Sequence, residues 1–134
     1  MKRHIAILLS VLAATPMLAH HSVKSEFDST KAMPISGIIT RVEWTNPHAW
    51  IYMDVKDAAG QTVAWRVELA APGALTRAGF DKSLIALKSP ITIEVWPAIQ
   101  DPSVGRAGNG RLLTLSDGRT FDVSDKWPDA KIMK

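Results

Sequence analysis

Apolar and polar residues alternate with a period of two along much of the chain. The alternation runs through residues 38–44, 49–56 and 63–69, and it returns at 91–96 and 112–115. Alternation of this kind is typical of β-strands that bury one face and leave the other face polar. The five runs therefore predict antiparallel strands joined by short connections.

The same pattern assigns the side chains of the first three runs to two faces. The apolar face contains Ile38, Val42, Trp44, Ala49, Ile51, Met53, Val55, Val63, Trp65, Val67 and Leu69. The polar or mixed face contains Arg41, Glu43, Trp50, Tyr52, Asp54, Lys56, Arg66 and Glu68. We expect the apolar face, including Trp44 and Trp65, to form the core.

The segments between the runs have their own signals. Residues 72–79 contain a proline near the start and a glycine at the end, which predicts a short helix. Residues 57–60 and 117–118 predict tight turns. Residues 100–110, rich in glycine and polar residues, predict a mobile loop. Residues 120–123 are expected to pair back on the preceding strand or to cap the sheet.

Three strands, a short helix and two further strands form the element order of the OB-fold, a small five-stranded β-barrel. We therefore predict an all-β, OB-fold-like domain over residues 33–127, preceded by an N-terminal arm (20–32) and followed by a C-terminal tail (128–134). A small open sandwich with a similar meander is the alternative architecture. A closed barrel would remove exposed sheet edges.

The first nineteen residues have the pattern of an export signal. Lys2 and Arg3 precede a short apolar stretch, and Ala19 is the small residue that signal peptidase requires. Cleavage after Ala14 is the alternative. The apolar stretch is too short for a membrane span, which needs about 20 residues. We expect a periplasmic or secreted protein without a transmembrane segment in its mature chain.

Charge and cysteine content narrow the possible functions. Without residues 1–19 the chain carries 14 Lys and Arg against 13 Asp and Glu, so the net charge of +3 falls to +1. Nucleic-acid-binding proteins usually carry a marked cationic face, and we therefore expect no nucleic-acid partner. The absence of cysteine excludes disulfides and thiolate metal sites.

The most informative chemical feature is the new N-terminus that cleavage after Ala19 would create. His20 would then carry a free α-amine beside its imidazole, and His21 follows directly. Neutral nitrogen ligands of this kind bind late transition metals. With His48 they would form a nitrogen-rich, cysteine-free site that favours Cu(II), with Ni(II) or Zn(II) as competitors. Glu26 or Asp28 could complete the site or orient a ring.

A purely structural interpretation of the histidines is also open. His20 and His21 could belong to a frayed terminus. Residues 44–48 form the predicted connection between the first two strands, in which Asn46 would cap the bend, Pro47 would hold the backbone and His48 would bond to a nearby carbonyl group. Metal binding therefore depends on whether the N-terminal arm folds against the connection that contains His48.

A second candidate site is the aromatic and charged face, defined here as Trp50, Tyr52, Trp96, Arg41 and Arg66. Aromatic surface beside charged groups is typical of sites for small ligands or partner proteins. The alternative is cross-strand packing, in which Arg41 and Arg66 pair with Glu43 and Glu68 while the aromatic side chains cover the sheet.

Several of these motifs occur together in a known order. They are Ala19-His20-His21-Ser22, Phe27-Asp28, Gly37, Trp44-Thr45-Asn46-Pro47-His48, Gly60, Trp65 and Leu75-Thr76-Arg77-Ala78-Gly79. The chain resembles a family of small exported bacterial proteins that is classed only as a domain of unknown function. The resemblance implies export and a compact β domain, and it implies no activity. Ser89-Pro90 stands where that family commonly has Gly-Asp, and Phe80 where it often has Trp.

The function that the sequence favours is binding rather than catalysis. The chain contains no Gly-x-Ser-x-Gly, no phosphate-binding glycine loop and no His-Glu-x-x-His. We expect an exported protein that binds a metal such as copper through His20, His21 and His48. The alternative is an adaptor that binds a small ligand or a periplasmic protein through its aromatic face. A copper-dependent oxidase is the less favoured third possibility.

Overall fold

The computed structural model describes residues 23–99 and 106–125. The predicted signal peptide, His20 and His21, and the predicted tail at 128–134 lie outside these residues.

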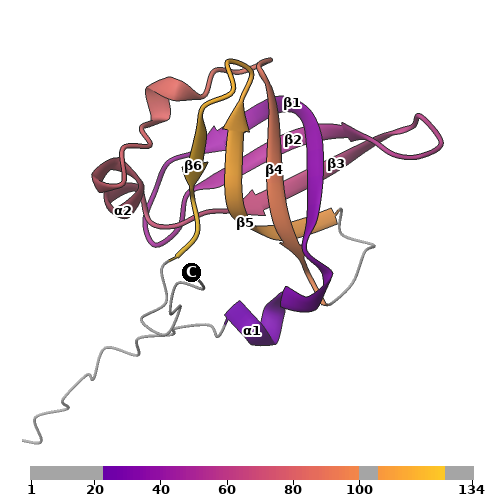
Figure 1. Cartoon of the computed structure of the whole chain (residues 1–134), viewed down its shortest axis with the longest axis horizontal. Coiled ribbons are helices and arrows are strands. Elements are labelled where there is room, and N and C mark those ends of the chain that lie inside the picture. Colours follow the sequence, from indigo (N-terminus) through magenta and orange to yellow (C-terminus); the bar gives the residue numbers. More distant parts are fainter. Residues whose placement is uncertain (1–22, 100–105, 126–134) are drawn as a thin grey trace, which may run out of the picture.

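Six strands and several short helical segments make up the described part of the chain (Figure 1). The strands are β1 (Met33–Glu43), β2 (Trp50–Lys56), β3 (Thr62–Glu68), β4 (Pro90–Pro97), β5 (Arg106–Leu115) and β6 (Thr120–Asp122). The helical segments are α1 (Val23–Glu26), η1 (Ser29–Lys31), α2 (Pro72–Arg77) and η2 (Lys82–Leu84). No helix within the described residues is long and apolar enough to cross a membrane.

The strands form a closed barrel. They are ordered β3-β2-β1-β4-β5, and parallel pairing of β3 with β5 closes the sheet. The short strand β6 extends the sheet beyond β5. The prediction of a small all-β barrel with a short helix between the third and fourth strands is confirmed. The sixth strand comes from residues 120–122, which do pair back on β5.

The core lies where the alternation predicted it in β2 and β3. Ile51, Met53 and Val67 are at most 1% exposed, and Trp65 is 5% exposed. Trp44 is partly buried and packs against the same core. At one end of the barrel, the ring of the fully buried Phe80 lies 5.2 Å from that of Phe121.

Phe80 lies three residues after α2 ends at Arg77, and the turn between them directs its side chain into the core. Gly79 adopts a positive φ of 86°, which an L side chain rarely tolerates, and the chain turns inward there. The predicted helix over residues 72–79 is present as α2, which ends at Arg77, two residues before the glycine.

The predicted inner face of β1 is wrong at Ile38. The pairing of β1 with β2 shifts by one residue between Ile39 and Arg41, which marks a β-bulge. A bulge reverses the inward and outward positions along a strand. Ile39 is therefore fully buried before the bulge and Val42 turns toward the core after it, while Ile38 is 43% exposed.

The predicted loop at 100–110 is wrong for residues 106–110, which begin β5. Glycine in this segment serves close packing. A Cβ atom on Gly110 would lie 2.8 Å from Leu69 Cδ2, and one on Gly108 would lie 3.0 Å from Val95 Cβ. Because β5 closes the barrel between β3 and β4, its inward positions have no room for larger side chains.

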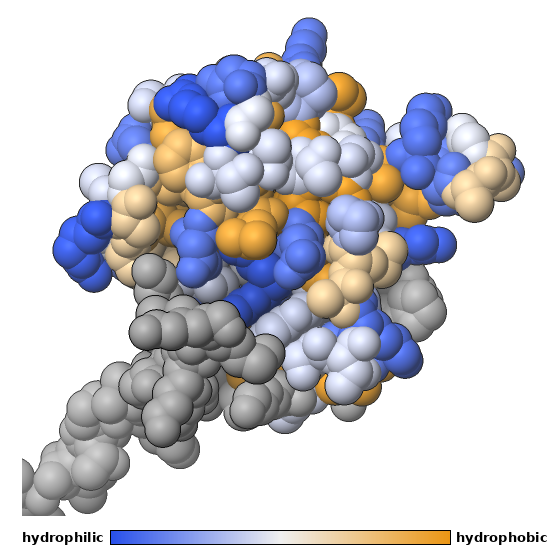
Figure 2. Space-filling view, in the orientation of Figure 1, coloured by the Kyte–Doolittle hydropathy of each residue, from blue (hydrophilic) through white to orange (hydrophobic). Residues whose placement is uncertain are grey.

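The outer face of β1, β4, β5 and β6 carries a row of hydroxyl side chains. Ser36, Thr92, Thr114 and Thr120 are consecutive partners across the four strands. Ser36 Oγ lies 2.8 Å from Thr92 Oγ1, and Thr114 Oγ1 lies 3.0 Å from Thr120 Oγ1. Figure 2 shows a pale, weakly polar band across this view, and strongly hydrophilic residues gather below it, toward α1.

Candidate functional site

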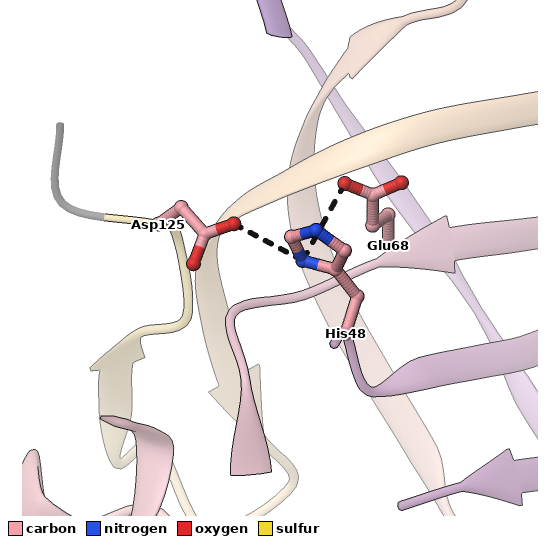
Figure 3. Close-up of side chains that lie close together, drawn as sticks. All are labelled: His48, Glu68 and Asp125. Atoms are coloured by element: carbon pink, nitrogen blue, oxygen red, sulfur yellow. Dashed lines mark ion pairs between the residues drawn. The ribbon is translucent and has the colours of Figure 1, made fainter. Parts of the chain in front are cut away.

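The structure brings together His48, Glu68 and Asp125, which we call the His48 cluster (Figure 3). His48 lies in the connection between β1 and β2, Glu68 ends β3, and Asp125 follows β6. His48 Nδ1 is 3.1 Å from Asp125 Oδ2 and 3.7 Å from Glu68 Oε1. One potential ligand atom from each residue lies within 4.8 Å of the other two.

Backbone hydrogen bonds hold two of the three segments in place. Leu69 N donates to Ala49 O at 2.8 Å and Ala49 N donates to Ala70 O at 3.2 Å, so the residue after His48 is paired with the residues after Glu68. The pairing continues the β2–β3 ladder past the ends of the strands.

The third segment is held in the same way. Ala70 N donates to Val123 O at 2.9 Å, and Val123 N donates to Arg111 O at 2.9 Å. The chain after β6 therefore crosses from β5 to the end of β3, which places Asp125 over His48.

The Nδ1 atom of His48 lies 3.2 Å from the carbonyl oxygen of Leu69. A carbonyl oxygen can only accept a hydrogen bond, so the tautomer of His48 that forms this bond has its proton on Nδ1. The expected bond from His48 to a nearby carbonyl is thus present. Three oxygens, from Leu69, Asp125 and Glu68, surround this one nitrogen.

The His48 cluster is partly open to solvent. The side chains of His48 and Asp125 are 32% and 29% exposed, and that of Glu68 is 12% exposed. One imidazole and two carboxylates are ligands that Zn(II) and Cu(II) accept. Ligand atoms about 2.0–2.2 Å from one metal ion lie about 3.0–3.7 Å apart at ordinary coordination angles. The distances from Nδ1 to the two carboxylates match this spacing.

Only one of the three predicted metal ligands, His48, lies in the described part of the chain. His20 and His21 lie outside it. Asp28, proposed as an additional ligand, accepts hydrogen bonds from the backbone and hydroxyl of Thr30 and pairs with Lys31 at 3.2 Å. The hydroxyl bond from Thr30 is the largest cause that lowers the pKa of Asp28. Glu26 ends α1, where its carbonyl accepts a hydrogen bond from Ile99 N at 2.8 Å.

Sequence reasoning missed the other two members of the cluster. Glu68 occupied an ordinary polar position in an alternating strand, where pairing with Arg66 was expected. In the structure it is buried and lies beside His48. Asp125 lies three residues beyond the last strand, within the predicted domain but outside any predicted strand. No local signal pointed to either residue as a partner of His48.

The aromatic and charged face is largely paired within itself on β1, β2 and β3. Arg41, Tyr52 and Arg66 are direct cross-strand neighbours. The Arg41 guanidinium lies 3.7 Å from the centre of the Tyr52 ring and also pairs with Glu43 at 2.8 Å. Tyr52 donates to Glu43 at 3.2 Å, and Arg66 lies 5.8 Å from the Trp50 ring.

Trp96 lies apart from this group. It is on β4 and pairs with Asn109 of β5, which in turn pairs with Glu68 of β3. Trp50 of β2 is the partner of Glu68 on the other side. Two strands thus separate Trp96 from Trp50, and the residues between the two rings are Glu68 and Asn109.

Comparison with known proteins identifies the family. A family model described as a family of unknown function (DUF6152) matches residues 8–107, and the chain belongs to this family. The resemblance to a family of unknown function is thereby confirmed. No match was found among curated proteins or among solved structures.

Proposed function

We propose that this member of a family of unknown function is an exported metal-binding protein and that the His48 cluster forms the centre of its site. Its cargo is a divalent transition-metal ion, with Cu(II) favoured and Zn(II) as the main competitor. His20 and His21 supply further nitrogen ligands after signal cleavage.

The observation that carries the proposal is the convergence of ligand atoms on His48 Nδ1. The oxygens of Asp125, Leu69 and Glu68 lie 3.1, 3.2 and 3.7 Å from it. A metal ion that replaced a proton on Nδ1 would have this nitrogen and the two carboxylates as candidate ligands, with a carbonyl oxygen beside them. Since binding displaces a proton, affinity should rise with pH.

The N-terminal histidines support copper over harder ions, because additional nitrogen ligands favour Cu(II). His21 is two residues before Val23, where α1 begins. An extended chain spans about 3.3–3.6 Å per residue, so His20 can lie up to about 10 Å from Val23. α1 itself is held to the end of β4, since Phe27 forms an isolated bridge with Ala98.

The aromatic face gives weaker support for the adaptor alternative. Arginine side chains already lie against Trp50 and Tyr52, and Glu43 pairs with both Arg41 and Tyr52. These contacts are those of cross-strand packing, which leaves fewer groups on this face for a ligand.

Calorimetric titration of Cu(II) and Zn(II) into protein that begins at His20 tests the proposal. We expect one ion per chain with a Kd of about 1 μM or lower, equivalent to about −8 kcal/mol. His48→Ala and Asp125→Asn should each weaken binding at least tenfold. Glu43→Gln is the matched control, because it removes a carboxylate from the same sheet outside the cluster, and it should bind normally.

A second protein with one extra residue before His20 separates the two parts of the proposal. Weaker Cu(II) binding in this protein would assign a role to the N-terminal amine. Equal binding would leave the His48 cluster as the site without the amine. Binding that His48→Ala and Asp125→Asn do not change would overturn the assignment of the cluster.

A further inference from the structure

A cavity of about 210 Å³ opens at the end of the barrel where β2 and β3 meet in a hairpin. The first four residues of β1 pair with β4 alone, and β1 pairs with β2 only from Gly37 onward. β5 pairs with β3 only from Trp65 onward. The β2–β3 hairpin therefore extends beyond the strands that close the barrel (Figure 1), and its inner face borders the cavity.

The walls of the cavity are mainly apolar. Val55 of β2 and Val63 of β3 are register partners, Trp65 follows on the same face of β3, and Ile35 of β1 also lines the cavity. Apolar walls with a few polar groups at the mouth are typical of ligand sites in β-barrels. The volume is that of about seven water molecules at about 30 Å³ each, so it suits the apolar tail of a small ligand.

Three charged side chains line the cavity: Lys56, Asp57 and Arg106, with a total formal charge of +1. Asp57 Oδ1 accepts hydrogen bonds from two backbone N–H groups of the hairpin turn, both at 2.9 Å. Lys56 Nζ donates to Thr62 Oγ1 at 2.7 Å. Within residues 23–99 and 106–125, no carboxylate forms an ion pair with Arg106.

The register of β5 directs Arg106 toward the mouth of the cavity. Arg106 is the partner of Trp65 in the parallel β3–β5 pair, and partners in a sheet project to the same face. Trp65 is on the inner face, so the exposed Arg106 side chain starts on that face, at the end of the barrel. A guanidinium in this position can bind a carboxylate through two hydrogen bonds.

Charges on the surrounding elements oppose one another in pairs. Asp54 and Arg66 have opposite signs and lie at outer positions of β2 and β3. Asp28 and Lys31, which precede β1, pair with each other at 3.2 Å. Glu94 of β4 interacts electrostatically with the half-buried arginine of β5. The excess positive charge at the cavity is therefore that of its own lining.

We propose that this end of the barrel binds a small amphiphilic carboxylic acid, with its apolar tail in the cavity and its carboxylate on Arg106. The site is separate from the His48 cluster, because Val63 and Trp65 lie in the first part of β3 and Glu68 ends the strand. Binding at this site therefore requires no metal ion.

NMR titration of sodium octanoate into the chelator-treated protein, followed at the indole N–H of Trp65, tests this proposal. Octanoate is the probe because its tail is close in size to the cavity. We expect a saturable shift with a Kd of about 1 mM or lower. Arg106→Gln should weaken octanoate binding at least about fivefold and leave binding of 1-octanol, the neutral analogue, unchanged.

Arg119→Gln is the matched control, because Arg119 is an exposed arginine that pairs with Asp117 in the β5–β6 turn. It should bind octanoate like the unmodified protein. Absence of a saturable shift at Trp65 would overturn the proposal, and so would octanoate binding that Arg106→Gln leaves unchanged. The same shift with sodium acetate would overturn it as well, because acetate lacks the apolar tail.

Discussion

Replacing Asn109 with leucine should stabilise the folded protein, although most substitutions at buried positions destabilise. Leucine has the same number of side-chain heavy atoms and the same branching as asparagine, so it fills a similar space without polar atoms. The substitution removes an Nδ2 group that is buried without a partner among the described residues.

The magnitude follows from the two hydrogen-bonding groups that are lost. An unsatisfied buried donor costs about 1–3 kcal/mol, and its removal recovers this free energy. The Oδ1 atom accepts one bond from Arg111 at 3.5 Å, which is at the long limit for a hydrogen bond. Its loss should cost only about 0.5 kcal/mol. We therefore expect the free energy of unfolding of Asn109→Leu to rise by about 1–2 kcal/mol.

Urea denaturation followed by far-ultraviolet circular dichroism measures this change, with a chelator present so that no metal contributes. The urea midpoint should rise at an unchanged m-value. Asn109→Ala removes the same amide without filling its space, and it should be less stable than the leucine variant. A loss of more than about 1 kcal/mol in Asn109→Leu would refute the reasoning, because it would mean that Nδ2 has a favourable partner in solution.

Three further predictions concern two residues of the barrel domain and Asp28, which lies before β1. In Gly37→Ala the new Cβ would lie 2.2 Å from the carbonyl oxygen of Asp54 on the adjacent strand. Urea denaturation should therefore show that the free energy of unfolding falls by more than about 2 kcal/mol. An unchanged urea midpoint would contradict the close approach of β1 and β2. Phe80→Ala empties a fully buried position. In the same assay it should lower the free energy of unfolding by about 3–5 kcal/mol. A decrease below about 1 kcal/mol would show that Phe80 does not fill the end of the barrel. Hydrogen bonds from Thr30 lower the pKa of Asp28 in the folded state, so its stabilising contribution is complete above the ordinary aspartate pKa and is lost as the pH falls through the lowered value. NMR titration should show a midpoint for Asp28 below about 3.9, and a higher midpoint would contradict the capping contacts.

The pattern of the sequence was sufficient to predict most of the barrel. Period-two alternation identified β2, β3 and β4, because each has one face against the core and the other face outward. The glycine after α2 located the end of that helix, because a positive φ there favours glycine. These features depend on neighbours in sequence, and a local pattern therefore reports them.

The predictions were wrong where contacts with segments distant in sequence determine the local structure. Ile38 occupies an inward position in the alternating pattern of the sequence, but a bulge in the pairing of β1 with β2 turns it outward. The glycines of residues 106–110 suggested a loop, whereas they allow β5 to pass close to β3 and β4. A strand rich in small residues and a loop have similar composition, and only the packing distinguishes them.

The candidate site likewise combines one residue that the sequence identified with two that only the structure identified. His48 was recognisable from the sequence because histidine in a turn is a potential ligand by itself. Its partners Glu68 and Asp125 lie 20 and 77 positions further along the chain, and each is an unremarkable acidic residue in its own segment. Barrel closure by β5 and the crossing of the chain after β6 bring them to one nitrogen atom. The sequence by itself determined the strands and the chemistry of each side chain, and the tertiary structure alone decided which side chains meet, because contacts between distant segments depend on the closed sheet.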